Sequence, residues 1–365
     1  MSLTCGIVGL PNVGKSTIFN ALTSSGVMVA KYPFSTIDPN LGIVEVPDER
    51  LKRLGEMFHP KKLTPATIEF IDIAGLVKGA SHGEGLGNRF LSHIREVDAI
   101  IHIVRCFRES DVAHIPGEIE PVRDIEMVNT ELILADLETV EKRADKAERE
   151  AKAGDKKAQQ ELNFIKRLKD YLSKGQAARS LMLSDEEREW VRGYFLLTIK
   201  PVLYVANGED SDLKRACPLV EGVFKFAEKE GTKAILISGK TESEISGLPK
   251  EEQRDFMLDL GIEDTSLNRL IRASYEVLGL ITFFTVVGEE VRAWSIPEGT
   301  TAPEAAGKVH SDMEKGFIKA EIMKYEDLIV SGSPHEVKNR GLLRVEGKDY
   351  IIRDGDIAFF RFHHS

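Results

Sequence analysis

A glycine-rich stretch near the N-terminus places phosphate-binding residue types at fixed spacing. The stretch GLPNVGKS, residues 9–16, follows an apolar run and opens the helical pattern STIFNAL. Its glycines let backbone N–H groups converge on phosphate oxygens, and the helix N-terminus adds the positive end of its dipole. Lys15 is placed to neutralise the β and γ phosphates of a nucleotide, and the Ser16 hydroxyl to ligate Mg²⁺. The stretch therefore predicts a phosphate loop.

Two further stretches supply residues that would complete a site for Mg²⁺ and a γ phosphate. In TIEFIDIAG an apolar run ends at Asp72, and Gly75 follows three residues later. This spacing is typical of an aspartate that holds Mg²⁺ through water and a glycine amide that senses the γ phosphate. In YPFSTIDPN, Thr36 or Ser35 offers a further metal ligand, and Thr36 is the better candidate. We expect Ser16, Thr36 and Asp72 to hold Mg²⁺.

The group that usually orients the attacking water is missing. GTPases of the Ras type carry a glutamine after the D-x-x-G glycine, whereas this chain has Leu76, which cannot hold a water. Hydrolysis must then be slow, use another group or depend on a partner. His82 in KGASHGEG and His114 in SDVAHIPG are alternatives, because an imidazole can orient or deprotonate water near neutral pH.

The stretch YVANGEDSD, residues 204–212, concerns the base of the nucleotide. Guanine-reading relatives carry N-K-x-D here, and the aspartate accepts two hydrogen bonds from guanine N1–H and its 2-amino group. This chain keeps Asn207 and Asp210 but has Gly208 in place of the lysine. A buried carboxylate facing the adenine N1 lone pair would stay unsatisfied, at a cost of roughly 1–3 kcal/mol. The stretch Glu209-Asp210-Ser-Asp212 is typical of an acidic turn, in which we expect Asp210 to point to solvent.

A second strand tip, ILISGK, contributes to the same region. It would bring Ser238 and the backbone amide of Gly239 near the edge of the base, where the amide can serve either purine. The signal from the residues around the base is therefore split: Asn207 and Gly208 fit ATP, whereas Asp210 leaves some room for GTP.

Short β-branched runs alternate with helical patterns over the first 246 residues, which predicts an α/β domain with a mostly parallel sheet. Strands are expected at residues 3–8, 41–46, 67–73, 99–104, 201–206 and 233–237. Between the fourth and fifth strands, apolar residues repeat at steps of three and four on both sides of Gly154, which predicts an inserted antiparallel helical hairpin of coiled-coil type. The motif Ser184-Asp-Glu-Glu187 has capping-box spacing and should begin another helix.

The pattern becomes strand-rich after residue 279, with one helix candidate, APEAAGKVHSDM. It predicts a small mixed sheet with a packed helix. The expected division is residues 1–127 and 200–279 for nucleotide binding, 128–199 for the helical insertion and 280–365 for the C-terminal domain.

Composition narrows the class of protein. Hydrophobic residues make up 42% and charged residues 30% of the 365 positions, the balance of a soluble globular protein. The net charge of −10 argues against general affinity for nucleic acid, and we expect no sequence-specific DNA binding. With no leader, no apolar run of bilayer length and three scattered cysteines, we expect a cytoplasmic protein without membrane contact, disulfides or a zinc site.

Several strings together resemble one family, the YchF-type Obg-like ATPases. They are GIVGLPNVGKST, the leucine after DIAG, GLVKGASHGEGLGNRFL, the helical insertion and EVRAWSIPEGTTAPEAAGKVHSDMEKGF, so the resemblance covers essentially the whole chain. It implies a P-loop domain of the GTPase superfamily and a C-terminal TGS domain of β-grasp, ubiquitin-like form. It also implies a preference for ATP, hydrolysis without the usual glutamine, and binding to ribosomes, particularly the large subunit.

Carried over residue by residue, the resemblance favours His114 over His82 as the residue that positions water, with Lys15 as the other catalytic residue. Asn12 resembles the asparagine that coordinates K⁺ in some related GTPases, so K⁺ is a candidate cation beside Mg²⁺. The family pattern at the base is N-x-x-E, from which Asp210 departs. The expected nucleotide contacts are Asn12, Val13, Gly14, Lys15, Ser16, Thr17, Gly75, Asn207, Gly208, Ser238 and Gly239.

Three functions compete on this basis. The first is an ATPase whose nucleotide state controls docking to the ribosome. The second is a switch that recognises RNA or protein and uses hydrolysis only to reset, and the third is a GTPase of translation. The basic residues Lys338, Arg340 and Arg344 lie among acidic ones, which favours a solvated surface over an RNA site. We expect a monomer.

Overall fold

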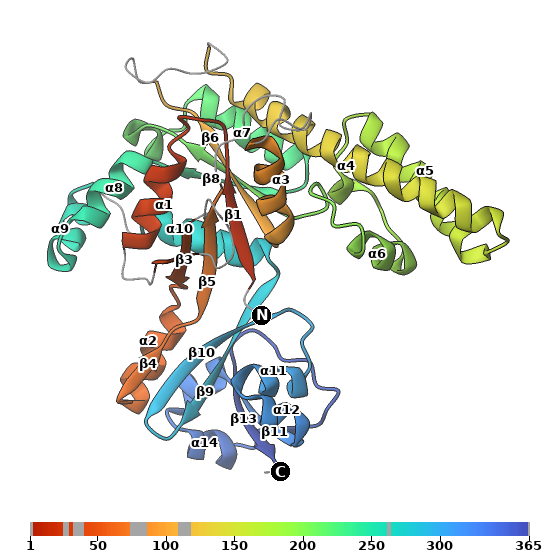
Figure 1. Cartoon of the computed structure of the whole chain (residues 1–365). Coiled ribbons are helices and arrows are strands. Elements are labelled where there is room, and N and C mark those ends of the chain that lie inside the picture. Colours follow the sequence, from red (N-terminus) through yellow and green to blue (C-terminus); the bar gives the residue numbers. More distant parts are fainter. Residues whose placement is uncertain are drawn as a thin grey trace. The chain divides into compact units, whose positions relative to one another are not determined.

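The computed structural model describes residues 3–24, 29–31, 40–73, 86–108, 118–260 and 264–363. Two compact units are present (Figure 1). The first unit comprises Met1–Ile43 and Glu69–Ser274, and the second unit comprises Val44–Ile68 and Tyr275–Ser365. The chain therefore passes from one unit to the other three times.

The sheet of the first unit has the strand order β2-β3-β5-β1-β6-β7-β8. Its central strands are parallel, and β6 and β7 are buried along their whole length, as expected when helices cover both faces of a sheet. All six strands predicted from the sequence are confirmed. The sheet also contains a strand that was not predicted, β2. Within the described residues its seven strands are β1 (Thr4–Val8), β2 (Val29–Lys31), β3 (Asn40–Glu45), β5 (Thr67–Asp72), β6 (Ala99–Arg105), β7 (Val202–Asn207) and β8 (Lys233–Ile237).

Helices connect these strands and cover the sheet. The carboxyl ends of the parallel strands meet at one edge, so the loops that carry the predicted site residues gather there. The helices are α1 (Lys15–Ser24), α3 (Leu86–Glu96), α4 (Pro121–Lys152), α5 (Lys156–Ser173), α6 (Asp185–Arg192), α7 (Pro218–Lys229), α8 (Gly239–Gly247), α9 (Lys250–Leu260) and α10 (Ser266–Val277), with short 3₁₀ turns at Ala178–Ser180 and Asp210–Leu213.

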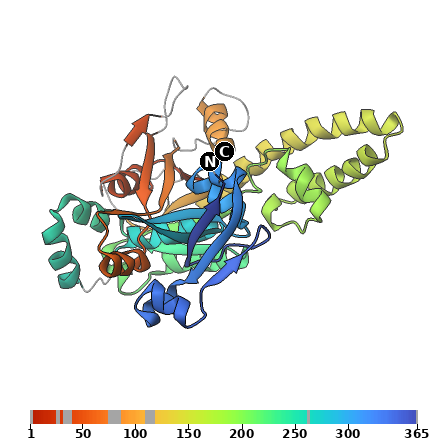
Figure 2. The ribbon, with the colours of Figure 1, turned by 90° about the horizontal axis from the view of Figure 1, so that it is seen from below.

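A helical hairpin formed by α4 and α5 projects from the sheet of the first unit (Figures 1 and 2). The chain reverses at Gly154, whose φ is 93°, and Asp155 caps α5 by accepting from Lys157 N at 2.8 Å. Buried Asp136 of α4 accepts hydrogen bonds from the backbone N–H groups of Leu197 and Thr198, both at 2.8 Å. That carboxylate fixes the returning chain to α4 shortly before β7. The helix predicted after Ser184 is also confirmed, with a full capping box.

The second unit has a sheet of order β12-β11-β13-β9-β10-β4. Helix α11 packs against it over a core that includes Phe283, Ile296, Ala305 and Phe360. Its elements are α2 (Glu49–Phe58), β4 (Lys62–Thr64), β9 (Leu280–Val287), β10 (Glu290–Pro297), α11 (Ala302–Val309), α12 (Ser311–Lys315), β11 (Phe317–Lys324), α13 (Tyr325–Ser331), α14 (Pro334–Asn339), β12 (Arg344–Glu346) and β13 (Asp356–Phe362).

The place of residues 44–68 differs from the predicted division, which assigned them to the nucleotide-binding domain. Here they add the edge strand β4, parallel to β10, and the amphipathic helix α2, whose Leu51 and Leu54 are buried. A three-residue strand pairs through its backbone, so its sequence carries no signal of which sheet it joins.

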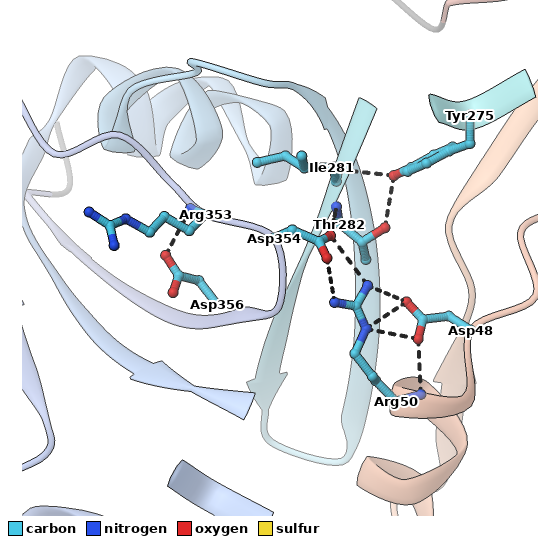
Figure 3. Close-up of polar contacts among 8 residues, drawn as sticks. All are labelled: Asp48, Arg50, Tyr275, Ile281, Thr282, Arg353, Asp354 and Asp356. Atoms are coloured by element: carbon cyan, nitrogen blue, oxygen red, sulfur yellow. Dashed lines mark hydrogen bonds and ion pairs between the residues drawn. The ribbon is translucent and has the colours of Figure 1, made fainter. Parts of the chain in front are cut away.

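Arg50 of α2 holds this segment to the rest of the second unit (Figure 3). Its guanidinium donates to Asp354 at 2.6 Å and to Asp48 at 2.8 Å, and lies 5.3 Å from the centre of the Phe284 ring. Asp354 also accepts from the backbone N–H of Thr282 at 2.8 Å, so the arginine is linked directly to strand β9. These contacts join α2, β9 and the turn before β13.

We predict that Arg50→Ala destabilises the second unit by about 1–2 kcal/mol, because two carboxylates lose a charged donor in a partly buried setting. Urea unfolding followed by the fluorescence of Trp294, in a Trp190→Phe background, measures this unit. The matched control is Lys52→Ala on the same helix, whose ion pair with Glu49 is exposed and should change stability by no more than about 0.5 kcal/mol. Equal effects of the two changes would contradict the prediction.

His102 of β6 gives the first unit a pH dependence. The side chain is buried beside the Tyr204 ring, and burial, followed by the charge of Arg179, lowers the pKa of His102 to about 3. Below pH 6.5 the His102 imidazole therefore takes up a proton in the unfolded chain but stays neutral in the folded chain. The free energy of unfolding then falls with the pH until the pH reaches about 3.

We predict that moving from pH 7 to pH 5 costs roughly 2 kcal/mol through this residue alone. In His102→Gln the pH-dependent loss should shrink by that amount, measured by urea unfolding with Trp190 as the reporter in a Trp294→Phe background. His335→Gln, a change at an exposed histidine, should keep the full loss. A pH dependence that His102→Gln leaves intact would show that other groups cause it.

Candidate nucleotide-binding site

The glycine-rich loop lies between β1 and α1, and close contacts dictate its shape. A Cβ on Gly9 would stand 2.6 Å from the carbonyl oxygen of Ile103, and a Cβ on Gly14 would stand 2.2 Å from the Asn207 amide nitrogen. Gly14 also has a φ of 88°, and Asn12 a φ of 63°, a value that asparagine tolerates better than most residues. The neighbouring strands β6 and β7 thus require glycine at these positions.

Lys15 and Asp72 meet where this loop passes the end of β5. The Lys15 ammonium lies 3.3 Å from Asp72 Oδ1, and only 11% and 15% of the two side chains are exposed. Strand pairing explains the meeting, since Asp72 lies beside Ile7 of β1 in the parallel register. The two residues that the sequence predicts for phosphate and metal are therefore in contact, while Ser16 and Thr17 are exposed at the start of α1.

Asn207, at the end of β7, joins three parts of the site. Its side-chain amide donates to the carbonyl oxygen of Val13 at 2.9 Å and accepts from the backbone N–H of Gly239 at 2.9 Å. Its backbone oxygen accepts from Cys106 N at 2.8 Å. The residue is buried, with 4% of its surface exposed. Its side chain therefore ties the glycine-rich loop to the start of α8.

Asp212 shapes the turn that follows, a role that the sequence analysis missed. This buried carboxylate accepts from Glu209 N at 2.9 Å and from Cys217 N at 3.0 Å. It comes so close to Gly208 that a Cβ there would lie 2.8 Å from Asp212 Oδ2. Gly208 is thus required by a carboxylate four residues later. The capping-box spacing of Glu209 and Asp212 was the available signal.

Asp210 corrects one expectation. We expected its carboxylate to point to solvent, but Asp210 Oδ1 accepts from the Ser238 hydroxyl at 2.5 Å and also from the Thr241 hydroxyl. Burial acts to raise the pKa of Asp210, but these hydrogen bonds, with the charge of Lys240, outweigh it and lower the pKa. Although the residue is exposed overall, its carboxylate is ionised at neutral pH and bonded within the protein. The sequence around Asp210 carries no signal of these partners, because Ser238 and Thr241 lie 28 and 31 residues away.

A cavity of about 720 Å³ opens beside these strand tips. Its size suits a small-molecule ligand. Of the predicted contacts it includes Gly14, Thr17, Asn207, Gly208, Ser238 and Gly239, and the structure adds Phe107, Arg108, Glu209, Asp210, Ser211, Lys240, Ser243 and Glu244.

The sequence analysis did not include Phe107 and Arg108 among the nucleotide contacts, although their position in the sequence gave a signal. They directly follow β6, the neighbour of β7, and ligands of parallel sheets bind where such strands end. The predicted residues Thr36, Gly75, Leu76, His82 and His114 lie outside the described part of the chain.

A mostly parallel sheet with a glycine-rich loop after its first strand, and a ligand-sized cavity at the same edge, characterises a P-loop nucleotide-binding protein. Comparison with known proteins agrees. The family described as "50S ribosome-binding GTPase" matches residues 4–136, and the family YchF-GTPase_C, described as a protein of unknown function, matches residues 280–363.

Full-length relatives narrow the class further. "Ribosome-binding ATPase YchF" of Bacillus subtilis is 50% identical over 367 residues, and the protein of that name from Escherichia coli O157:H7 is 48% identical over 363 residues. Both alignments cover 100% of each chain. The solved structure of the Schizosaccharomyces pombe YchF GTPase aligns with a TM-score of 0.87 and 38% identity, covering 99% of this chain and 98% of that one. The chain belongs to the YchF family.

Within the ranges that the structure describes, we find no helix whose length and apolar character would let it span a bilayer.

We predict that Asn207→Ala weakens ATP binding roughly tenfold to several-hundredfold, because the Val13 carbonyl and the Gly239 amide would both lose a buried partner. Calorimetric titration with a non-hydrolysable ATP analogue and Mg²⁺ measures the change. Asn20→Ala, at an exposed position of α1, is the matched control and should bind as the wild type does. Unchanged affinity in Asn207→Ala would show that the loop holds its shape without this amide.

Proposed function

We propose that this protein is a nucleoside-triphosphate hydrolase that prefers ATP, accepts GTP less well, and binds the ribosome according to its nucleotide state. The observation that carries the proposal is the contact of Lys15 with Asp72 at the phosphate loop of a chain whose full-length relatives are named ribosome-binding ATPases. Both charges then have a use: the lysine neutralises phosphate oxygens, and the aspartate attracts a hydrated metal ion.

The donors fit Mg²⁺. Ser16 offers an exposed hydroxyl and Asp72 a carboxylate, and oxygen ligands with retained water are what this ion takes. Among the described residues there is no group of three or more histidine, cysteine or acidic side chains that would hold a metal unaided. Ser16, Thr36 and Asp72 would therefore share the ion with the nucleotide, and its charge would stabilise the phosphates during transfer. Asn12, exposed in the loop, is the proposed K⁺ ligand.

Water positioning is assigned to His114. Its segment leaves the sheet after β6, whose last residue, Arg105, pairs with Asn207 of β7. The strand that precedes His114 in the sequence thus ends at the edge where the phosphate loop lies. An imidazole there would orient water toward the γ phosphate and accept its proton, replacing the glutamine that Leu76 excludes. The segment with His82 starts from the same edge, after Asp72, so the preference for His114 rests on the family resemblance.

The base subsite supports ATP. Gly208 leaves no side chain to cover the base. Half-buried Phe107 lines the same cavity, and the Arg105 guanidinium lies over its ring, 4.6 Å from the ring centre. The Gly239 amide already donates to Asn207, so the two strand tips are fixed relative to each other. A translation-associated GTPase remains the second candidate, because Asp210 keeps a carboxylate in this cavity.

The remaining parts are assigned to ribosome docking. The strand order β10-β9-β13-β11-β12, with α11 packed on the sheet, supports a TGS domain of β-grasp form. The apolar seam of α4 and α5 supports a coiled-coil insertion. We propose that these two parts contact the large ribosomal subunit, and that the protein acts as a cytoplasmic monomer.

We predict that His114→Ala keeps the wild-type affinity for ATP and lowers kcat at least a hundredfold, in line with the usual contribution of a general base. His82→Ala, the matched change in the other glycine-containing stretch of sequence, should keep its turnover. Phosphate release under saturating ATP measures both. If turnover is unchanged in His114→Ala, this histidine has no part in the mechanism.

We also predict that Lys15→Ala weakens ATP binding at least a hundredfold and makes cosedimentation with ribosomes insensitive to added nucleotide, because the phosphates lose their only cationic partner from the P-loop motif. Sedimentation with ATP analogue, with ADP and without nucleotide tests it against the wild type. Wild-type sedimentation that is the same in all three conditions would contradict nucleotide-controlled docking.

A further inference from the structure

The Asp210 carboxylate occupies the position from which guanine-binding relatives read their base, yet the protein itself supplies its hydrogen-bond donors. Ser238 Oγ donates to Asp210 Oδ1 at 2.5 Å, and Thr241 Oγ1 donates to the same oxygen. The two hydroxyl oxygens are 3.1 Å apart, and 1% of Ser238 and 3% of Thr241 is exposed. One carboxylate oxygen is therefore held by two buried hydroxyls.

Separate contacts fix both sides of this group. Ser238 directly follows β8 and caps α8, where its hydroxyl accepts from Thr241 N at 3.3 Å. The next residue, Gly239, donates to Asn207. On the other side, Asp212 holds the turn that carries Asp210. The hydroxyls and the carboxylate thus meet because the turns that follow β7 and β8 bring them together.

This arrangement changes how the carboxylate can act toward each purine. Guanine recognition needs both carboxylate oxygens, one for N1–H and one for the 2-amino group. With Oδ1 already bonded to two hydroxyls, guanine would have to displace them or use a single oxygen. Adenine has a lone pair at N1 and supplies no donor there, but a carboxylate that the protein has satisfied loses nothing when adenine binds.

We propose that Ser238 and Thr241 determine nucleotide specificity by holding the Asp210 carboxylate through their hydroxyls, which makes the site tolerant of adenine and poor for guanine. The inference rests on the proposed function, in that a nucleoside triphosphate occupies this cavity. The preference for ATP then comes from the two hydroxyls that hold the carboxylate, because the carboxylate that reads guanine in relatives is retained in this chain.

The test is the ratio of affinities for non-hydrolysable GTP and ATP analogues, measured by calorimetry with Mg²⁺. Thr241→Val removes one hydroxyl, keeps the side-chain shape and leaves the Ser238 cap in place. We expect it to shift the ratio toward GTP about threefold or more, and the double variant Ser238→Ala/Thr241→Val to shift it at least tenfold. Ser246→Ala, elsewhere on α8, should leave the ratio at the wild-type value.

A double-mutant cycle that combines these substitutions with Asp210→Ala decides whether the hydroxyls act on nucleotide specificity through the carboxylate. In that background the hydroxyl substitutions should no longer move the ratio. Inosine triphosphate, which lacks the 2-amino group, adds a second readout: the double variant should gain more affinity for GTP than for ITP. An unchanged ratio in Thr241→Val and the double variant, or the same shift with and without Asp210, would overturn the inference.

Failure of the proposed function would look different. A wild-type protein that binds GTP more tightly than ATP would refute the proposed preference and, with it, the inference that the site is poor for guanine. A wild-type preference for ATP that the hydroxyl variants leave unchanged would overturn the inference alone. A wild-type protein that binds neither analogue would refute both.

Discussion

The site depends on one buried amide. Asn207 connects the phosphate loop, through the Val13 carbonyl, with the start of α8, through the Gly239 N–H. Because its amide comes so close to Gly14, the loop can pass only if that position is glycine. A residue at the tip of β7 thereby fixes a loop that begins at the tip of β1, although β6 lies between these two strands.

Three carboxylates of this site have three different roles, and their donors explain why. Asp72 faces an ammonium group, so its charge is balanced by a residue that phosphate would also attract. Asp212 accepts backbone N–H groups and shapes a turn. Asp210 accepts hydroxyls from another segment and borders the cavity. Residue type alone does not separate the three, since each is an aspartate at or near the end of a strand.

Residues 44–68 show a related dependence on tertiary context. In sequence they fall between two predicted metal ligands, Thr36 and Asp72, and both flanking strands, β3 and β5, pair within the sheet of the first unit. The segment itself belongs to the second unit, where Arg50 binds two carboxylates and β4 extends the sheet. The strand that ends in Asp72 is thus covalently continuous with the second unit.

Much of this protein is determined by local sequence. Apolar runs produced the six predicted strands, Gly154 and Asp155 produced the hairpin turn, and the glycine and lysine spacing produced the phosphate loop, because each depends on neighbouring residues and backbone geometry. Tertiary structure alone decided contacts between distant residues: Asn207 with Val13, 194 residues apart, Thr64 with Glu290, 226 apart, and Asp210 with Ser238 and Thr241. A hydrogen bond has no sequence signature when its partners lie on different strand tips, since only the packing of the sheet brings donor and acceptor within 3 Å.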